Sequence, residues 1–305
     1  MIDWTSIRKS LIGDQKKSIL PKRIKLPIMP LSVMKFAKRA EDPNANPEEF
    51  ARIIETDSAL TCELLRYVNS SATGLSHRVR CIQQAIAILG IQACKTFLLT
   101  TAIKASMKGI ESRLIDLETF WVSNLERALF AREIAVQLDA DHDLAFSGGM
   151  LQDFLLPVTT NELYPEYQEF LRDQQEKPIS LPEFERGKFH WDHAEVAAQV
   201  MFNWEFPDSL ICCVMLHHRG IKIMRDKRFQ KTAAAAVALS ALIPDSMIQE
   251  VNGFAQLVRL DEIWPQFDLM AIAKRVDERF NDISPVKVNR TSLLKRCQRS
   301  AAMAH

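Results

Sequence analysis

Apolar residues recur at intervals of three and four along most of the chain, and this spacing constrains the fold more than any other feature. Leu60, Leu64, Leu65 and Val68 form one such apolar face. No segment shows the alternation of apolar and polar residues that is typical of a β-strand. Only nine glycines occur in 305 residues, which argues against the many tight turns of an all-β protein. The pattern therefore predicts an all-α protein.

Several helix ends can be placed from local chemistry. Asn46 before Pro47 predicts an N-cap followed by proline in the first helical turn. Asp57 or Ser58 is suited to cap the next helix, and Gly90 is suited to end the helix that starts after Cys81.

Prolines and apolar runs set the remaining boundaries. Residues 26–30, with two prolines, predict an extended lead-in to a helix over residues 31–40. A helix is expected from about residue 141 to residue 156, where Pro157 limits it. Another is expected from Pro207 to His218.

Charge and cysteine content narrow the functional classes. Lys plus Arg (39) nearly balance Asp plus Glu (38), so the protein has no strong overall field to attract nucleic acid. The six cysteines show no CxxC spacing and are interpreted as reduced core residues. The first twenty residues do not resemble a signal peptide, and no apolar run reaches the ~18 residues of a membrane span. We expect a cytoplasmic protein with no membrane span.

Both ends of the chain are basic. We predict a basic N-terminal extension over residues 1–24 and a basic C-terminal tail over residues 285–305. The simplest interpretation is two solvated tails. Contact with nucleic acid, an acidic protein or a membrane surface is the alternative, and nucleic acid is the less favoured partner.

One set of residues suggests chemistry, namely Asp153, His193, His217 and His218, which fall on three predicted helices. Carboxylate and imidazole groups from different helices can hold metal ions that activate water for phosphate-ester hydrolysis. Each residue also has a structural explanation. Asp153 can bond to a neighbouring backbone group or to His193, His193 follows a candidate N-cap at Asp192, and a histidine pair suits a helix C-terminus. We favour the structural interpretation.

The order of several motifs resembles the HDOD family, which is related to the HD-domain metallo-phosphohydrolases. The resemblance covers about residues 25–220. It is carried by LPIMP at 26–30, IIETDSALTCELLRYVNS at 53–70, AIAILG at 85–90, Phe120-Trp121, AFSGGMLQD at 145–153, HAEVAA at 193–198, WEFP at 204–207 and His217-His218.

This resemblance implies a two-part helical bundle. An N-terminal helical subdomain is expected over residues 25–110 and an HD-like helical subdomain over residues 111–284. Family members resemble bacterial signal-transduction components. The resemblance therefore implies a non-catalytic regulatory module that binds a signalling protein or a small ligand, without a cofactor.

Departures from the HD pattern separate this chain from an active hydrolase. Ser123 and Asn124 stand where a histidine is expected, Gln152 replaces the histidine of a His-Asp pair, and Ser240 lies where an aspartate is expected. Neutral side chains of this kind are poor ligands for a divalent ion. The resemblance thus implies a degenerate metal site and no enzyme activity. A metal-dependent phosphohydrolase acting on a nucleotide or cyclic dinucleotide is the alternative.

A cleft for a ligand or partner is predicted around Arg66, Asn69, Trp121, Asp153 and His193. Simpler roles compete with this prediction. Asn69 can close its helix, Arg66 can lie on a solvated face, and Trp121 can belong to the core. The pattern does not predict an oligomeric state.

Overall fold

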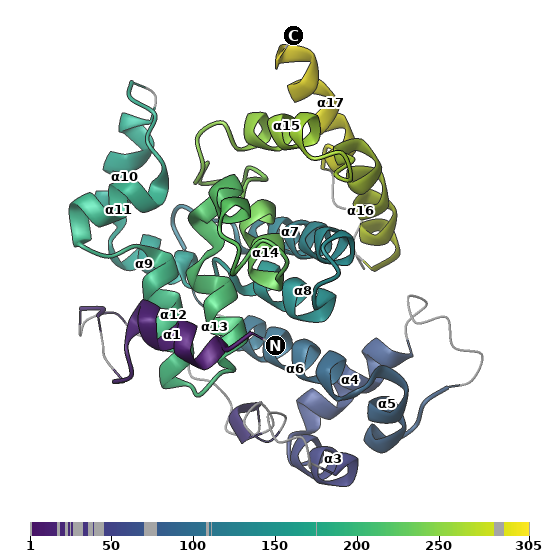
Figure 1. Cartoon of the computed structure of the whole chain (residues 1–305). Helices are drawn as coiled ribbons and strands as arrows, with labels where there is room; N and C mark the ends of the chain where they lie inside the picture. Colours follow the sequence, from purple (N-terminus) through teal and green to yellow (C-terminus); the bar gives the residue numbers. More distant parts are fainter. Residues whose placement is uncertain are drawn as a thin grey trace.

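The structure is a computed structural model in which every regular secondary-structure element described is a helix (Figure 1). The description covers residues 2–16, 19–21, 24, 26, 33–35, 39, 46–69, 78–107, 110, 112–174, 176–283 and 290–304. No strand occurs among these residues, so the predicted all-α class is confirmed. The predicted lead-in over residues 26–30 and helix over residues 31–40 lie largely outside the described residues, as does Ser70.

Seventeen elements are bounded in the described ranges. They are α1 (Trp4–Ile12), α3 (Pro47–Glu55), α4 (Ser58–Val68), α5 (Ile82–Leu89), α6 (Ile91–Ser106), α7 (Leu117–Gln137), α8 (His142–Leu151), α9 (Leu156–Glu162), α10 (Tyr164–Asp173), α11 (Leu181–Phe189), α12 (His193–Asn203), α13 (Asp208–Met215), the 3₁₀ segment η2 (His217–Arg225), α14 (Ala233–Ser240), α15 (Gly253–Ile263), α16 (Leu269–Ile283) and α17 (Leu293–Ala304).

Most predicted caps are present. The Asn46 side chain accepts a hydrogen bond from Glu48 N, and Pro47 occupies the first turn of α3. Of the two candidates for α4, Asp57 is the cap, because its carboxylate accepts from Ala59 N and Leu60 N. Gly90 ends α5 with φ 82°, a conformation that glycine adopts without strain.

Two helices are shorter than predicted, and both breaks lie where candidate site residues occur. The helix expected through residue 156 stops at Leu151, and a turn over residues 152–155 follows. Pro157 does not limit this helix but lies in the first turn of α9, where its missing N–H is no loss. Likewise α13 ends at Met215, so His217 and His218 begin η2 instead of ending α13.

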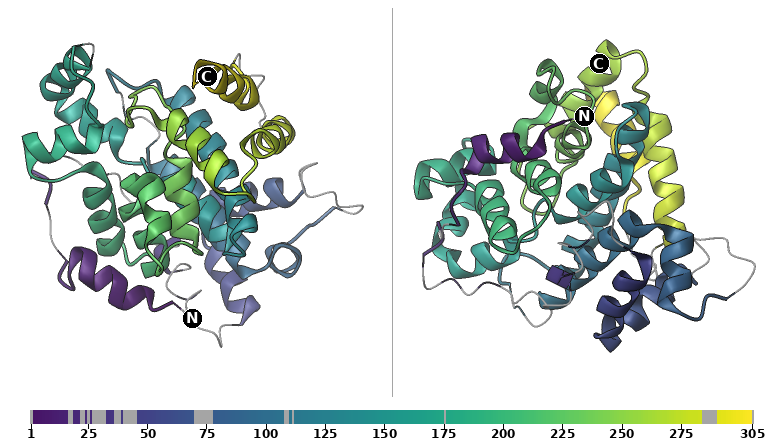
Figure 2. Two further views of the ribbon diagram at one scale, coloured as in Figure 1. Left: turned by 45° about the horizontal axis from the view of Figure 1, so that its top comes forward. Right: turned by 60° about the horizontal axis from the view of Figure 1, so that its bottom comes forward.

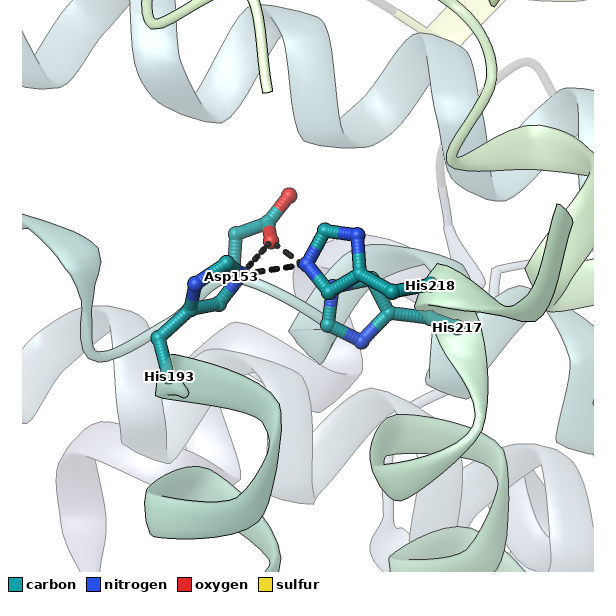
Figure 3. Close-up of side chains that lie close together, drawn as sticks. All are labelled: Asp153, His193, His217 and His218. Carbon is teal, nitrogen blue, oxygen red and sulfur yellow. Dashed lines mark hydrogen bonds and ion pairs between the residues drawn. The ribbon is translucent and has the colours of Figure 1, made fainter. Parts of the chain in front are cut away.

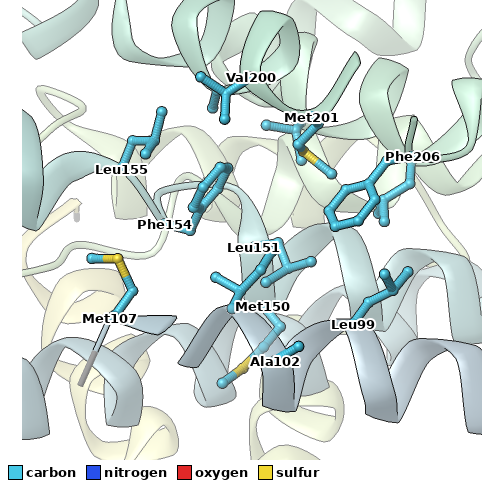
Figure 4. Packing of buried hydrophobic residues seen from close by; sticks show 14 of the residues in the cluster. Leu99, Ala102, Met107, Met150, Leu151, Phe154, Leu155, Val200, Met201 and Phe206 are labelled. Carbon is cyan, nitrogen blue, oxygen red and sulfur yellow. The ribbon is translucent and has the colours of Figure 1, made fainter. Parts of the chain in front are cut away.

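Two hydrophobic clusters fill the interior. In one of them, Leu99 of α6 and Met107, which follows α6, pack in the same cluster as Met150 and Phe154 (Figure 4). The core therefore continues across the predicted boundary near residue 110. The second cluster joins α7 to α14, α15, α16 and α17.

The described helices of the two basic ends, α1 and α17, pack on the body instead of extending as solvated tails. The helix α1 packs on α12 and α13 (Figure 2). Its Arg8 donates to Asp208 Oδ1 at 2.9 Å. At the other end, α17 packs on α15 and α16. Its Arg296, together with Arg290, pairs with Glu126 of α7, a residue only 3% exposed. Charge pairing with a buried acid explains why these cations are not free.

Length and hydropathy limit which of the described helices could cross a membrane. No single helix there is both long and apolar enough to cross a bilayer. Only the bent pair formed by Ile82–Leu89 and Ala93–Ser106, with a 117° angle between them, reaches the required length and composition jointly.

Close packing of α7 on α8 gives a first testable prediction. A Cβ added at Gly149 would lie 2.8 Å from Ala128 Cα, so the two backbones would have to move apart. Gly149→Ala is expected to lower the free energy of unfolding by about 1–3 kcal/mol. Gly187→Ala on α11 is the matched control. Its added Cβ meets nothing within 4 Å, and it should raise stability by roughly 0.5–1 kcal/mol. Urea unfolding measures both, and equal effects would contradict the packing argument.

Candidate metal centre

Four side chains from three separate segments converge in the interior (Figure 3). Asp153 lies in the turn after α8, His193 is the first residue of α12, and His217 and His218 begin η2. One ligand atom from each residue lies within 4.8 Å of every other. The helix breaks described above therefore place these residues together.

The centre is enclosed and its contacts are short. Asp153, His193 and His217 have side chains 1% exposed, and His218 is 9% exposed. Asp153 Oδ1 lies 3.3 Å from both His193 Nε2 and His217 Nε2. His193 Nε2 lies 2.8 Å from His218 Nε2.

Each imidazole has its other nitrogen engaged outside the centre. Nδ1 of His217 lies 2.6 Å from the carbonyl of Val214, which can only accept, so this nitrogen carries the proton. Nδ1 of His193 lies 2.6 Å from Glu185 Oε2, and Nδ1 of His218 lies 3.0 Å from Glu250 Oε1. Such partners fix imidazole tautomers and direct the Nε2 lone pairs inward.

The surroundings shift the pKa values of Asp153, His193 and His218 in different directions. Burial acts to raise the pKa of Asp153, but its interactions with His193 and His217 and the Arg127 charge hold that pKa well below its usual value. Burial acts to lower the pKa of His193, yet Glu185 and Asp153 hold it well above the usual value. Burial and the neighbouring imidazoles His217 and His193 lower the pKa of His218.

Arg127 of α7 fixes the remaining oxygen of Asp153. Its guanidinium donates to Asp153 Oδ2 at 2.6 Å and to the carbonyl of Ile243 at 3.0 Å and 2.6 Å. Asp245 Oδ2 lies 3.5 Å away on the same guanidinium. The pair with Arg127 leaves Asp153 Oδ1 pointing toward the three imidazoles.

These residues fit a single divalent cation. Among the described residues, Asp153 Oδ1 and His217 Nε2 are buried without a hydrogen bond of ordinary geometry. Arg127 pairs with Asp153 and Asp245, whereas Glu185 and Glu250 lie against the imidazoles of His193 and His218, so with neutral imidazoles the carboxylates outnumber the cation among these contacts. Three imidazole nitrogens and one carboxylate oxygen are a ligand set that suits Zn²⁺. One cation would satisfy both the orphaned atoms and the excess negative charge.

Residues 243–250 close one side of the centre. Besides the Arg127 contacts, the carbonyl of Gln249 accepts from Leu181 N of α11 at 2.8 Å. Glu250 then reaches His218. Ile248 within this segment has φ 51°, a left-handed conformation that is strained for a β-branched residue. Contacts with α7, α11 and η2 thus hold the segment in place, although the backbone conformation of Ile248 is unfavourable.

The positions identified as degenerate contribute no ligand atom to this group. Ser123 is half-buried, and the neighbouring Asn124 is buried with Nδ2 unpaired within the described part. Gln152 is fully buried, and neither of its amide atoms has a partner there. Ser240 donates to the Val237 carbonyl at 2.8 Å, one turn back in α14.

The predicted cleft residues divide into two groups. Asp153 and His193 lie in the centre, whereas the others have contacts elsewhere. Asn69 ends α4 by donating to the carbonyls of Leu65 and Val79 at 2.7 Å and 2.8 Å. Arg66 is largely exposed and pairs with Glu63. Trp121 is buried in the core beside Phe120.

Sequence reasoning missed the groups that orient the ligands, namely Arg127, Glu185 and Glu250. Arg127 had a visible signal, because it follows Asn124 by three residues on the apolar face of a helix that also carries Ala128 and Ala131. A charged residue at such a position needs a buried partner. Nothing local marks Glu185 or Glu250.

Residues 26–220 match the HDOD domain family, and because this is more than half of the chain, the protein belongs to that family. A curated relative is an uncharacterized protein of Treponema pallidum (strain Nichols), 23% identical over 197 residues. That match covers 63% of this chain and only 37% of the relative, so this chain spans little more than a third of it.

Solved structures share the fold at low identity. An HDOD domain protein with unknown function from Geobacter sulfurreducens has a TM-score of 0.60 at 19% identity, covering 90% of this chain and 97% of its own. A "Putative phosphohydrolase" from Shewanella amazonensis SB2B has a TM-score of 0.60 at 18% identity, covering 95% of both chains. A "Putative signal transduction protein" from Marinobacter aquaeolei VT8 has a TM-score of 0.61 at 19% identity, covering 98% of this chain and 64% of its own. At these identities the likeness establishes the fold alone.

Proposed function

We propose that this protein is a non-catalytic HDOD regulatory module whose buried centre holds one divalent cation. The proposed setting is signal transduction in a bacterial cytoplasm, with a partner protein or small ligand bound elsewhere on the fold. The observation that carries the proposal is that four protein ligand atoms converge in an enclosed site.

Coordination chemistry separates this arrangement from a hydrolase. Structural zinc sites have four protein ligands, whereas catalytic sites keep one position open for water. Asp153, His193, His217 and His218 would hold the ion and fill its coordination shell. When bound, the ion would join the turn after α8 to α12 and η2. Arg127 donates to the second oxygen of Asp153, so the two oxygens of this carboxylate face different groups.

The names of the structural neighbours suggest two different functions. The Marinobacter protein is named for signal transduction, and the Shewanella protein for phosphohydrolysis. The enclosed ligand set and the neutral residues Gln152 and Ser240 favour the first function for this chain. Phosphohydrolase activity remains the alternative that the experiment must address.

The test measures metal content and hydrolysis together. Protein purified without chelator should carry about one zinc-class ion per chain by mass spectrometry. It should not hydrolyse bis(p-nitrophenyl) phosphate or a cyclic dinucleotide faster than buffer containing the same metal. Asp153→Asn should lose the ion, whereas His142→Ala, which replaces an exposed histidine, should retain it.

Either part of the proposal can fail separately. Hydrolysis present in the unchanged protein and in His142→Ala but absent in Asp153→Asn would assign a phosphohydrolase. Unchanged protein without bound metal, even after incubation with zinc, would remove the ion from the proposal.

A further inference from the structure

A strongly basic segment leads away from the metal centre. Residues 219–231, all described, start directly after His217 and His218 and run through η2 and the turn before α14. They carry six exposed cations, which together we call the cationic face: Arg219, Lys222, Arg225, Lys227, Arg228 and Lys231. Because the whole chain has a net charge of only +1, this face is a local concentration of charge.

The backbone beneath the cationic face is anchored. Ile223 and Phe229 are buried in the second hydrophobic cluster. The guanidinium groups of Arg219 and Arg228 lie 5.9 Å and 5.1 Å from the Phe229 ring centroid. Lys222 and Arg225 are three residues apart in a 3₁₀ helix, which places them on the same edge. The cations are therefore presented in a defined arrangement.

Most of this charge is not balanced within the described part of the chain. Asp226 is the one acidic residue among residues 219–231, and it pairs with Arg219 at 3.6 Å and Arg228 at 2.8 Å. Lys222, Arg225, Lys227 and Lys231 form no ion pair with any described carboxylate. Glu250, near Lys222, is instead bonded to His218.

We propose that the cationic face binds an acidic segment of a partner protein. Ile221 and Met224, half-buried between the cations, would give such a segment apolar contacts as well as charge. Single-stranded nucleic acid would need aromatic rings for stacking, but the one aromatic residue of the segment, Phe229, is buried. The inference rests on the proposed regulatory function, because it places the partner on the element that begins with two metal-centre residues.

The test uses a fluorescein-labelled peptide of repeated Glu-Glu-Leu-Asp and measures fluorescence anisotropy. Affinity should fall when salt is raised from about 50 mM to about 200 mM. The triple variant Lys222→Glu, Arg225→Glu, Lys227→Glu should bind at least ~10-fold more weakly. The matched control, Arg52→Glu, Lys104→Glu, Arg172→Glu, makes the same charge change at exposed positions on α3, α6 and α10 and should bind within about twofold of the unchanged protein.

Additional variants and ligands distinguish an acidic peptide from other partner classes. They also test the cationic face independently of metal binding. Lys222→Gln with Arg225→Gln provides a milder variant if the triple variant is unstable by circular dichroism. Absence of peptide binding at low salt, or equal loss in both triple variants, would overturn the proposal. Tighter binding of duplex DNA, or of phosphatidylglycerol vesicles, that is lost in the cationic-face variant would replace the partner class. Peptide binding retained in Asp153→Asn would leave this inference standing even if the centre binds no ion.

Discussion

Asp153→Ala is expected to lower the free energy of unfolding by about 3–5 kcal/mol, because it leaves a buried charge without its partner. The Arg127 side chain is 2% exposed, and Asp153 is its nearest carboxylate. Asp245, at 3.5 Å, compensates only weakly. Since small domains are typically stable by about 5–15 kcal/mol, the loss is a large fraction of the total. Urea unfolding followed by circular dichroism measures it.

Two further variants test the cause of that loss. Asp143→Ala removes a half-buried carboxylate that lies 3.5 Å from Arg132, and it should cost less than about 1 kcal/mol. Arg127→Met combined with Asp153→Ala removes both buried charges and should recover part of the stability. A loss in Asp153→Ala no greater than that in Asp143→Ala would show that the buried pair is not important for stability.

Zinc added to chelator-treated protein is expected to raise the free energy of unfolding by about 2.7 kcal/mol at a free concentration of about 100 times Kd. The reason is that the ion binds the folded centre and not the separated ligands. His218→Gln should remove most of this shift, because it deletes one of four ligands at the most exposed edge of the centre. Thermal unfolding with and without zinc measures the effect.

Two controls test whether the stabilisation is specific to zinc bound at this centre. His142→Gln replaces a histidine outside the centre, and it should preserve the zinc shift. Magnesium should produce little shift, because it prefers oxygen ligands in octahedral geometry. An equal zinc shift in both histidine variants would mean that the stabilising ion binds elsewhere.

Local chemistry predicted several helix caps, but it did not predict where α8 and α13 end or which distant residues pair. The caps at Asn46 and Asp57 are determined by residues two or three positions away, so they are visible in the sequence. The turn over residues 152–155 depends on packing, and Pro157 was compatible with either the end or the start of a helix.

The metal centre, too, could be predicted only in part from the sequence. Its four candidate ligands were identified from residue type and order, but their favoured interpretation was four separate structural roles. Only the fold shows that one atom of each converges. Arg127 and Asp153 are 26 residues apart, and Arg290 and Glu126 are 164 apart. A count of basic residues at the C-terminus cannot reveal an acidic partner at that distance.

The ligands of the centre lie far apart along the chain, and this has a consequence for unfolding. An ion held by Asp153, His193 and His217 would close loops of about 40 and 24 residues, as a covalent cross-link does, and loop closure limits the freedom of an unfolded chain. All six cysteines are free. The cross-link in this fold would therefore be one that forms and dissolves with the supply of metal, independently of the redox state of its surroundings.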